Sequence, residues 1–334
     1  MSSIGWDIGG VNVKVARVAG DEVSQARTES FSIEHDADRL SSVLERLGRD
    51  LGAHGCGHAV TMTAELSQRF RTKAEGVGFI LDALDRAFPG APMHVLDTAG
   101  RFRTPAEARA DAIEVSASNW TATAMVVAAE HPDVILLDIG STTTDIIPIE
   151  SGRVRALGRT DPDRLATGEL VYSGALRTPV EALVRAVPWR DGVALVSADG
   201  FAHTGDVHQW LGTVIRRAGD ERGTARDSRD HAGERLARVV CADRTMIDDD
   251  GITTIATHVA EAQVAAIATA VIRVLARHPR LTRAAVLGLG RPIAERAARA
   301  AGLGIIPMDG RWSDDASCAA PAVAVARLLE GQGD

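Results

Sequence analysis

Cysteine is scarce in this chain. The 334 residues include three cysteines, Cys56, Cys241 and Cys318, and these lie far apart. An even number of cysteines at short spacings would indicate a disulfide framework. Three widely separated cysteines do not. The run Cys56-Gly57-His58 also lacks the spacing of a structural metal site. We therefore expect three buried or incidental thiols.

The chain also lacks an excess of basic charge. It has 37 lysines and arginines against 45 aspartates and glutamates, which gives a formal net charge of −8. Because a nucleic-acid-binding protein needs a basic face, we expect no nucleic-acid partner. One group of arginines is interleaved with acids, and this mixture predicts a solvated helical face. Its members are Arg216, Arg217, Arg222, Arg226 and Arg229.

Long apolar runs are missing as well. No run approaches the roughly 20 residues of a membrane-spanning helix, and the chain begins with an expected strand that contains Asp7 instead of a signal peptide. We expect a cytoplasmic protein with no membrane partner, and the sequence leaves its oligomeric state open. A hydrophobic content of 45% over 334 residues is typical of a globular protein that divides into two domains.

One sequence pattern occurs twice. In Val134–Ile149 an apolar run rich in β-branched residues leads into Asp138-Ile139-Gly140, and a small hydroxylated turn precedes the next apolar run. The stretch Ser3–Ala16 repeats this design, with Asp7-Ile8-Gly9 at the matching place. Hydroxyl and N–H groups of such turns can donate to phosphate, and a carboxylate at the strand end can hold Mg²⁺ through water. Each hairpin alone also fits an ordinary hairpin with a polar tip, whereas the repetition favours two related domains.

These hairpins resemble the first and second phosphate motifs of the actin, sugar kinase and Hsp70 ATPase superfamily. The stretch Ala284–Arg291, a strand that runs into Gly-Leu-Gly, is similar to its adenosine motif. The resemblance implies an α/β fold of two ribonuclease-H-like domains with a cleft between them. The first would comprise residues 1–131, with the helix at 316–330 returning to it, and the second residues 132–315.

The same resemblance implies a set of ligand-binding residues. Asp7 and Asp138 are the expected Mg²⁺ ligands. ATP is a further candidate cofactor, with its adenine near the Gly-Leu-Gly turn. The residues expected to bind the cofactor are Gly9, Gly10, Asn12, Lys14, Gly140, Ser141, Thr142, Thr143, Gly288 and Gly290.

Further polar residues follow the other expected strands. A strand ending near Met62 would place Glu65 at the carboxyl edge of a sheet, where open α/β sheets bind ligands, with Lys73 within reach. A capped helix with surface charges explains the same residues. Arg177 is a candidate for a diphosphate or carboxylate, because its guanidinium binds either group bidentately, although an exposed arginine on a helix face is the alternative. Asn119 and Tyr172 complete the candidate substrate contacts.

Several stretches are more specific than the superfamily. They are Gly5–Gly10, Val60–Leu66, Lys73–Val77, Ala117–Trp120 and Gly168–Gly174. They resemble a hydantoinase/oxoprolinase-like family linked to tetrahydromethanopterin-dependent C1 transfer, whose archaeal members are similar to a methanofuran-biosynthesis synthase. Where the family has Met-Thr-Gly-Glu-Leu this chain has Ala64, but Glu65 is present.

This closer resemblance implies a transferase. It would move an aminomethylfuran-methyl group from its diphosphate to the phenol oxygen of a γ-glutamyl tyramine or tyrosine derivative, with release of diphosphate. Its partners would be small-molecule substrates that carry a diphosphate. Glu65 or Asp145 is the predicted base for the phenol proton, and Lys14 or Lys73 would contact phosphate. The predicted catalytic residues are Asp7, Asp138, Glu65, Asp145 and Lys73.

Two other functions fit the superfamily. One is an ATP-dependent small-molecule kinase or a hydantoinase/oxoprolinase-type amidohydrolase. The other is a non-catalytic, nucleotide-sensing scaffold. A pocket for adenine at Val286–Gly290 would favour ATP chemistry, whereas a pocket filled by Arg291 or bulky side chains would favour the diphosphate transferase.

Overall fold

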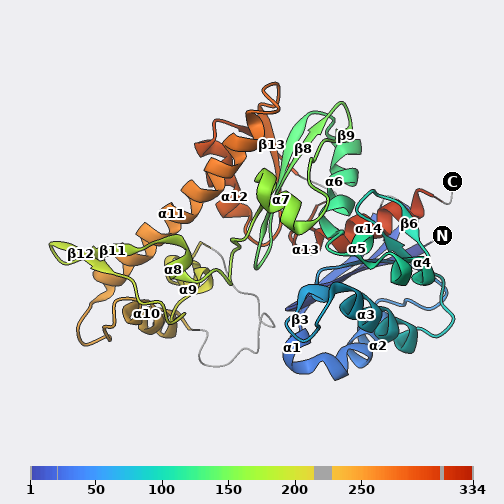
Figure 1. Cartoon of the computed structure of the whole chain (residues 1–334), viewed down its shortest axis with the longest axis horizontal. Coiled ribbons are helices and arrows are strands. Elements are labelled where there is room, and N and C mark those ends of the chain that lie inside the picture. Colours follow the sequence, from blue (N-terminus) through green and yellow to red (C-terminus); the bar gives the residue numbers. More distant parts are fainter. Residues whose placement is uncertain (1, 21, 214–227, 309–311, 333–334) are drawn as a thin grey trace. The chain divides into compact units, whose positions relative to one another are not determined.

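The computed structural model describes residues 2–20, 22–213, 228–308 and 312–332 (Figure 1). The chain divides into two compact units. Unit 1 comprises Met1–Asp133, Ile149–Arg164 and Met308–Asp334, and unit 2 comprises Val134–Pro148 and Leu165–Pro307.

Unit 1 is built on a six-stranded sheet in the order β3-β2-β1-β4-β5-β6. Strands β1, β4 and β5 are parallel, and β2, β3 and β6 are antiparallel to their neighbours. The strands are β1 (Ser2–Ile8), β2 (Asn12–Ala19), β3 (Glu22–Ser30), β4 (Gly57–Met62), β5 (Met93–Leu96) and β6 (Phe102–Arg103). Six of the seven β1 residues are buried, which explains the continuous apolar run in the sequence.

Some helices of unit 1 begin at a capping side chain. Thr72 caps α3 by accepting from the N–H of Glu75, and Thr104 and Glu107 form a capping box before Pro105 in α4. The helices are α1 (Ile33–Asp36), η1 (Ala37–Arg39), α2 (Leu40–Asp50), η2 (Ala64–Leu66), α3 (Lys73–Ala87), α4 (Pro105–Ala110), α5 (Ala112–Val115), α6 (Asn119–Glu130), α13 (Asp314–Cys318) and α14 (Ala320–Glu330). The last of these, drawn in red in Figure 1, packs on β1, β2 and α6.

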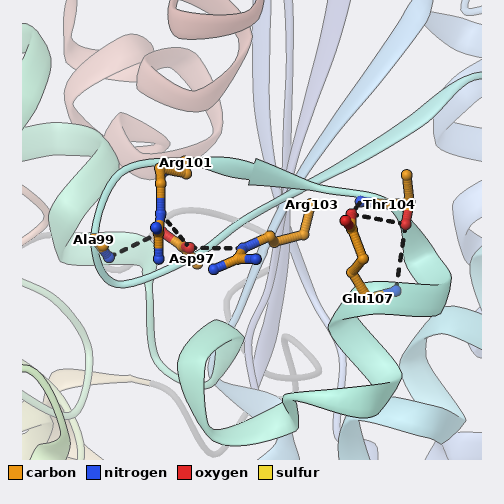
Figure 2. A network of polar contacts seen from close by, with 6 residues as sticks. All are labelled: Asp97, Ala99, Arg101, Arg103, Thr104 and Glu107. Atoms are coloured by element: carbon orange, nitrogen blue, oxygen red, sulfur yellow. Dashed lines mark hydrogen bonds and ion pairs between the residues drawn. The ribbon is translucent and has the colours of Figure 1, made fainter.

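The loop after β5 is fixed by one buried carboxylate (Figure 2). Asp97 accepts hydrogen bonds from the backbone N–H groups of Ala99 and Arg101, at 2.9 and 2.8 Å. It also pairs with the Nε atoms of Arg101 and Arg103, at 3.2 and 2.8 Å. The loop therefore stands at the carboxyl end of the sheet without depending on a ligand for its shape.

Unit 2 repeats the strand order of unit 1. Its sheet runs β10-β8-β7-β13-β14, and β9 pairs with the end of β8. The strands are β7 (Val134–Ile139), β8 (Thr144–Glu150), β9 (Arg153–Val154), β10 (Leu170–Val171), β13 (Arg283–Leu287) and β14 (Gly304–Ile306), with β11 (Ala186–Trp189) and β12 (Gly192–Leu195) as a separate ribbon. Both β7–β13 and β13–β14 are parallel.

The remaining helices begin with α7 (Asp161–Thr167), which crosses the boundary between the units. The helices of unit 2 are α8 (Val180–Leu183), α9 (Thr204–Leu211), α10 (Arg229–Arg238), α11 (Asp249–Leu275) and α12 (Arg291–Ala300). In Figure 1, α11 runs from the β13 region to α9 and α10, and it contacts both helices and α12. Four members of the interleaved arginine group, Arg216, Arg217, Arg222 and Arg226, lie outside the described part of the chain. The fifth, Arg229, stacks on Trp210, with its guanidinium carbon 3.7 Å from the ring centroid.

The long helix α11 corrects one expectation. Among the described residues it is the one helix long and apolar enough to span a membrane by length and composition, and half of its most apolar window is buried. Its apolar residues appear in the sequence with polar ones between them, so no continuous run marks the helix. Ile252, Ile255, Val259, Ile267 and Val271 are fully buried, as in the core helix of a globular unit.

After β8, Ser151 and Gly152 turn the chain with positive φ, and β9 forms only two residue pairs with β8. One further expectation, the boundary of the second domain, differs from the structure. The segment 149–164, expected in the second domain, belongs to unit 1, where β9 packs on α6. The three cysteines form no disulfide: Cys56 is buried, Cys318 is partly buried and Cys241 is exposed.

Candidate active site

The first hairpin of unit 1 aligns three polar side chains across three strands. Asp7 pairs in register with Lys14 on β2 and with Thr61 on β4. The Nζ atom of Lys14 lies 3.1 Å from Oδ2 of Asp7, and the Thr61 hydroxyl donates to Oδ1 at 3.3 Å. Asp7 is 2% exposed. The strand register therefore presents a buried carboxylate beside an ammonium group at the carboxyl end of β1.

The turn after Asp7 is closed by its own backbone. The N–H of Gly9 donates to the carbonyl of Asn12 at 2.9 Å. A side chain at Gly9 would meet that same carbonyl at 2.9 Å, so the tight turn requires glycine. Gly10 and Asn12 are partly exposed at the surface of the unit.

The second hairpin, in unit 2, has the same closure. The N–H of Gly140 donates to the carbonyl of Thr143 at 3.0 Å. Asp138 is 9% exposed at the end of β7, and Ser141, Thr142 and Thr143 are partly exposed in the turn. The structure thus repeats the match seen in the sequence. Asp7-Ile8-Gly9 and Asp138-Ile139-Gly140 each end the first strand of their sheet, and the same hydrogen bond closes each turn.

The segment Ser173–Thr178 lies directly against the second turn. Ala175 donates to the carbonyl of Gly140 at 2.9 Å, and Leu176 and Arg177 both donate to that of Ser141 at 3.0 Å. The backbone of Arg177 is therefore anchored at the turn, and its side chain is exposed. This placement suits the predicted anion contact.

The glycines of the third motif pack against the strand end of the second. A Cβ atom at Gly288, whose φ is +88°, would lie 2.3 Å from Oδ1 of Asp138. A Cβ atom at Gly290 would lie 2.3 Å from Ile139, whose carbonyl accepts from the Gly290 N–H at 2.8 Å. Arg291 is exposed and pairs with Glu295. These glycines thus have a packing role next to Asp138, and adenine binding at them stays a prediction.

A second buried carboxylate lies in unit 1 just beyond β4. Glu65, on η2, is 1% exposed. Lys73, at the start of α3, places Nζ 3.7 Å from Oε1 of Glu65 and 3.1 Å from Oδ2 of Asp161. A Cβ atom at Gly76 would lie 2.6 Å from Cα of Glu65, so this glycine lets α3 approach the carboxylate-bearing turn. Among the described residues, neither oxygen of Glu65 has a hydrogen-bond donor in range and direction.

This environment changes the acidity of Glu65. Burial raises the pKa of its carboxyl to about 7, although the positive charge of Lys73 lowers it, as do the N–H groups of Glu65 and Ala117. Asp161 acts in the raising direction. A carboxylate that gains a proton near neutral pH and lacks a fixed donor is well suited to exchange a proton with a ligand.

The start of α6 contributes further polar groups near this carboxylate. Ala117 has a positive φ of 50°, a strained conformation for a residue other than glycine, and its backbone N–H lies near enough to Glu65 to lower the pKa of that carboxyl. Asn119 is the first residue of α6 and is partly buried. Trp120 stacks on the guanidinium of Arg164 at 4.2 Å. The expected substrate contact at Asn119 therefore lies two residues after the backbone group that faces Glu65.

The other two candidate residues lie in unit 2. Asp145 is 8% exposed on β8, where it pairs in register with Leu170 of β10. Tyr172 is 59% exposed, so its phenol points into solvent in this unit. Sequence reasoning did not select Asp161, Thr61 or Gly174, because their partners are distant in sequence and only the folded sheets bring them together.

The candidate residues thus form three groups. Asp7 and Lys14 make one and Glu65 and Lys73 another, both in unit 1, while the turn at 140–143 and Arg177 make the third in unit 2. The described residues contain no cluster of three or more His, Cys, Asp or Glu side chains suited to a metal. Mg²⁺ often binds through one or two carboxylates plus substrate phosphates. The carboxylates of Asp7 and Asp138 are donors of the kind that this ion prefers. That Asp7 and Asp138 share one ion stays a prediction.

Two sheets of the same order, each with an Asp-Ile-Gly turn on its first strand, define the actin-like ATPase fold. Among solved structures, the activator of the 2-hydroxyisocaproyl-CoA dehydratase from Clostridium difficile with bound ADPNP has this fold. The two superpose with a TM-score of 0.50 at 13% identity, over 100% of this chain and 97% of that chain.

Relatives in sequence are more specific. A protein of Methanocaldococcus jannaschii named (4-{4-[2-(gamma-L-glutamylamino)ethyl]phenoxymethyl}furan-2-yl)methanamine synthase is 37% identical over 99% of this chain and 98% of its own length. A protein of the same name from Methanococcus vannielii is 33% identical over 59% of this chain and 91% of its own length. The hydantoinase/oxoprolinase family profile matches residues 57–332. The chain belongs to the hydantoinase/oxoprolinase family.

Proposed function

We propose that this protein is a diphosphate-releasing transferase of methanofuran-type cofactor biosynthesis. It joins an aminomethylfuran-methyl group to the phenol oxygen of a γ-glutamyl tyramine or tyrosine derivative. The observation that carries this proposal is the 37% identity, over 99% of the chain, to a protein named as the synthase of such a phenoxymethylfuran. The reaction would take place in the cytoplasm on small-molecule substrates.

The reaction breaks one C–O bond and forms another. The bond between the furan-bound methylene and the diphosphate breaks, and its electron pair leaves with the diphosphate. The phenol oxygen then bonds to the methylene carbon, which the furan ring stabilises by delocalising positive charge. The phenol loses its proton to a base. Such a reaction needs a site that stabilises the leaving anion and a group that accepts a proton.

Each hairpin turn would supply donors for the diphosphate. N–H groups at Gly10 and Val11 and N–H and hydroxyl groups at Ser141–Thr143, all in partly exposed residues, would donate to the diphosphate oxygens as negative charge develops on them. Lys14, held beside Asp7, would add a positive charge, and Arg177 would add a bidentate donor. Mg²⁺ bound by Asp7 and Asp138 would neutralise part of the charge of the diphosphate.

Glu65 is the better placed of the two candidate bases. Its oxygens make no full hydrogen bond to a described residue, and burial raises its pKa to about 7. With the phenol hydroxyl directed at it, Glu65 would accept the proton during ether formation. Lys73, 3.7 Å away, would then stabilise the phenolate charge.

An ATP-dependent kinase or amidohydrolase is the second candidate function. It is favoured by the fold, which this chain shares with a protein described with bound ADPNP. The third motif, from Val286 to Gly290, would then face the adenine. The packing of Gly288 and Gly290 against Asp138 and Ile139 explains those glycines without a nucleotide, and we therefore rank this function second.

Calorimetric titration separates the two functions. The purified full chain is titrated, with Mg²⁺, against ATP and against the aminomethylfuran-methyl diphosphate, and the phenol acceptor is then added while the ether product is followed by mass spectrometry. Binding of the furan diphosphate and formation of the ether, without ATP binding, is the expected result. ATP binding with no affinity for the furan compound would refute the transferase. The variant Asp7→Asn serves as the control for binding at the turn.

A further inference from the structure

A fully buried hydrogen-bonded network links two helices of unit 2 to the segment behind the second turn. His208 on α9 is 1% exposed, and Gln263 on α11 is 0% exposed. The Nε2 atom of His208 lies 2.8 Å from Oε1 of Gln263. The side-chain amide of Gln263 donates to the hydroxyl of Ser173 at 3.0 Å and to the carbonyl of Gly174 at 2.9 Å.

The hydrogen bonds fix the donor and acceptor roles of Gln263 and His208. Since Gln263 uses both amide hydrogens on Ser173 and Gly174, its Oε1 can only accept, and His208 must carry its proton on Nε2. The Nδ1 atom of His208 then accepts from the hydroxyl of Thr213, at 2.8 Å. Burial lowers the pKa of His208, which favours this neutral form. Gln263 is therefore committed to a single orientation.

The residues that Gln263 holds press directly on the second turn. A Cβ atom at Gly174 would lie 2.5 Å from the N and C atoms of Thr142, so the two backbones are in direct contact. The hydroxyl of Thr144 donates to the carbonyl of Ser173 at 2.6 Å. Thr204 adds a second donor to the carbonyl of Gly174, at 2.9 Å. A shift of Gly174 would therefore move the N–H groups of the turn.

We propose that Gln263 is a positioning residue for diphosphate binding at Gly140–Thr143. It acts through Ser173 and Gly174 and contacts no substrate itself. The inference rests on the proposed function, because it takes this turn as a diphosphate site. Donors stabilise an anion well only when a rigid support aims them, and a buried amide with three partners on two segments is such a support.

The test compares two hydrogen bonds that join the same helices. Gln263→Leu removes the contacts with Ser173, Gly174 and His208. The control Thr253→Val removes the bond from Trp210 Nε1 to the Thr253 hydroxyl, 3.0 Å long, which also joins α9 to α11 but does not reach the segment Ser173–Thr178. The full-length proteins are titrated with inorganic diphosphate and Mg²⁺, and KM is measured separately for the furan diphosphate and the phenol acceptor.

We expect Gln263→Leu to weaken diphosphate binding about tenfold and to raise KM for the furan diphosphate, with KM for the phenol unchanged. Thr253→Val should keep the wild-type values. Equal diphosphate affinity in folded Gln263→Leu and wild type would overturn the inference, as would an equal rise in both KM values. Should Gln263→Leu fail to fold, Thr204→Val, which removes the second donor to Gly174, decides by the same criteria. A wild-type protein that binds no diphosphate would refute the proposed function itself, and the inference with it.

Discussion

The ammonium group of Lys73 lies 3.7 Å from Oε1 of Glu65, a carboxylate with a fully buried side chain. Two opposing effects meet at this pair. Burial favours the neutral acid and raises the pKa of Glu65, while the charge of Lys73 favours the carboxylate and lowers it. The result, a pKa of about 7, lets a modest change of pH or of neighbour switch the protonation state.

Glu65→Gln should abolish most activity and stabilise the fold. As a base, Glu65 must be ionised, so wild-type kcat/KM should rise with pH through about 7, and the variant should lose roughly 10²- to 10⁴-fold. The folded carboxyl binds its proton more tightly than the unfolded one, so its contribution to stability falls as pH rises from about 4.5 to about 7. Ionising the buried carboxyl group therefore costs folding free energy on the order of 3 kcal/mol above pH 7, and a glutamine side chain avoids this cost.

Two measurements check this prediction: kcat/KM for ether formation against pH, and urea unfolding at pH 5 and pH 8. The gain in unfolding free energy from Glu65→Gln should be larger at pH 8. Asp85→Asn, at an exposed position of the same helix as Lys73, is the matched control and should change neither property. A pH profile without an acidic limb near 7 would exclude Glu65 as the base.

Lys73→Met should move the acidic limb to higher pH. The substitution keeps the length of the side chain and removes the charge that lowers the pKa of Glu65, while Asp161 continues to raise it. The carboxylate would then form only at higher pH. Lys73→Arg, which retains the charge, should leave the limb nearer its wild-type position. The measurement is again kcat/KM against pH, and an acidic limb at the same pH in all three proteins would mean that another group sets it.

Asp97→Asn should destabilise unit 1 without involving the candidate site. Burial alone would raise the pKa of Asp97, but hydrogen bonds from Arg101, Arg103 and Ala99 outweigh it and lower the pKa. The stabilisation from the carboxylate is therefore present above the ordinary aspartate pKa of about 3.9 and is lost as pH falls through the lower folded value. Asn keeps one acceptor oxygen and loses the charge, so we expect a cost of roughly 1–3 kcal/mol at pH 7.

Chemical unfolding at pH 7 and pH 3 tests the Asp97 prediction, with Asp82→Asn as control. Asp82 forms an exposed pair with Arg109 at 2.7 Å, and exposed pairs contribute well under 1 kcal/mol in most cases. The difference between wild type and Asp97→Asn should shrink at pH 3. A constant difference at both pH values would show that the charge of Asp97 is not what stabilises the loop.

How far the sequence predicts this protein depends on how local the signal is. The strands of both hairpins and the capped helices follow from apolar runs and capping residues, and the repeated Asp-Ile-Gly pattern correctly indicates two sheets of one order. The ion pair between Lys73 and Asp161 joins residues far apart in the chain, and no local pattern predicts it. The role of Gln263 is equally invisible, because it depends on Ser173 and His208, which reach it from other segments.

Gly5→Ala should destabilise unit 1 strongly, since Gly5 is where α14 approaches the central strand β1. A Cβ atom at this position would lie 1.9 Å from the carbonyl oxygen of Ala322 and 2.9 Å from Cβ of Ala326. Backbone atoms cannot rotate away as a flexible side chain can, so α14 would have to move off the sheet, at a cost of about 3 kcal/mol or more. Gly192→Ala on β12 is the matched control, because nothing lies within 4 Å of the added atom. Urea unfolding of the full chain should show a lower midpoint for Gly5→Ala and a nearly unchanged one for Gly192→Ala. Equal midpoints would mean that α14 does not pack on β1 as closely as this contact requires.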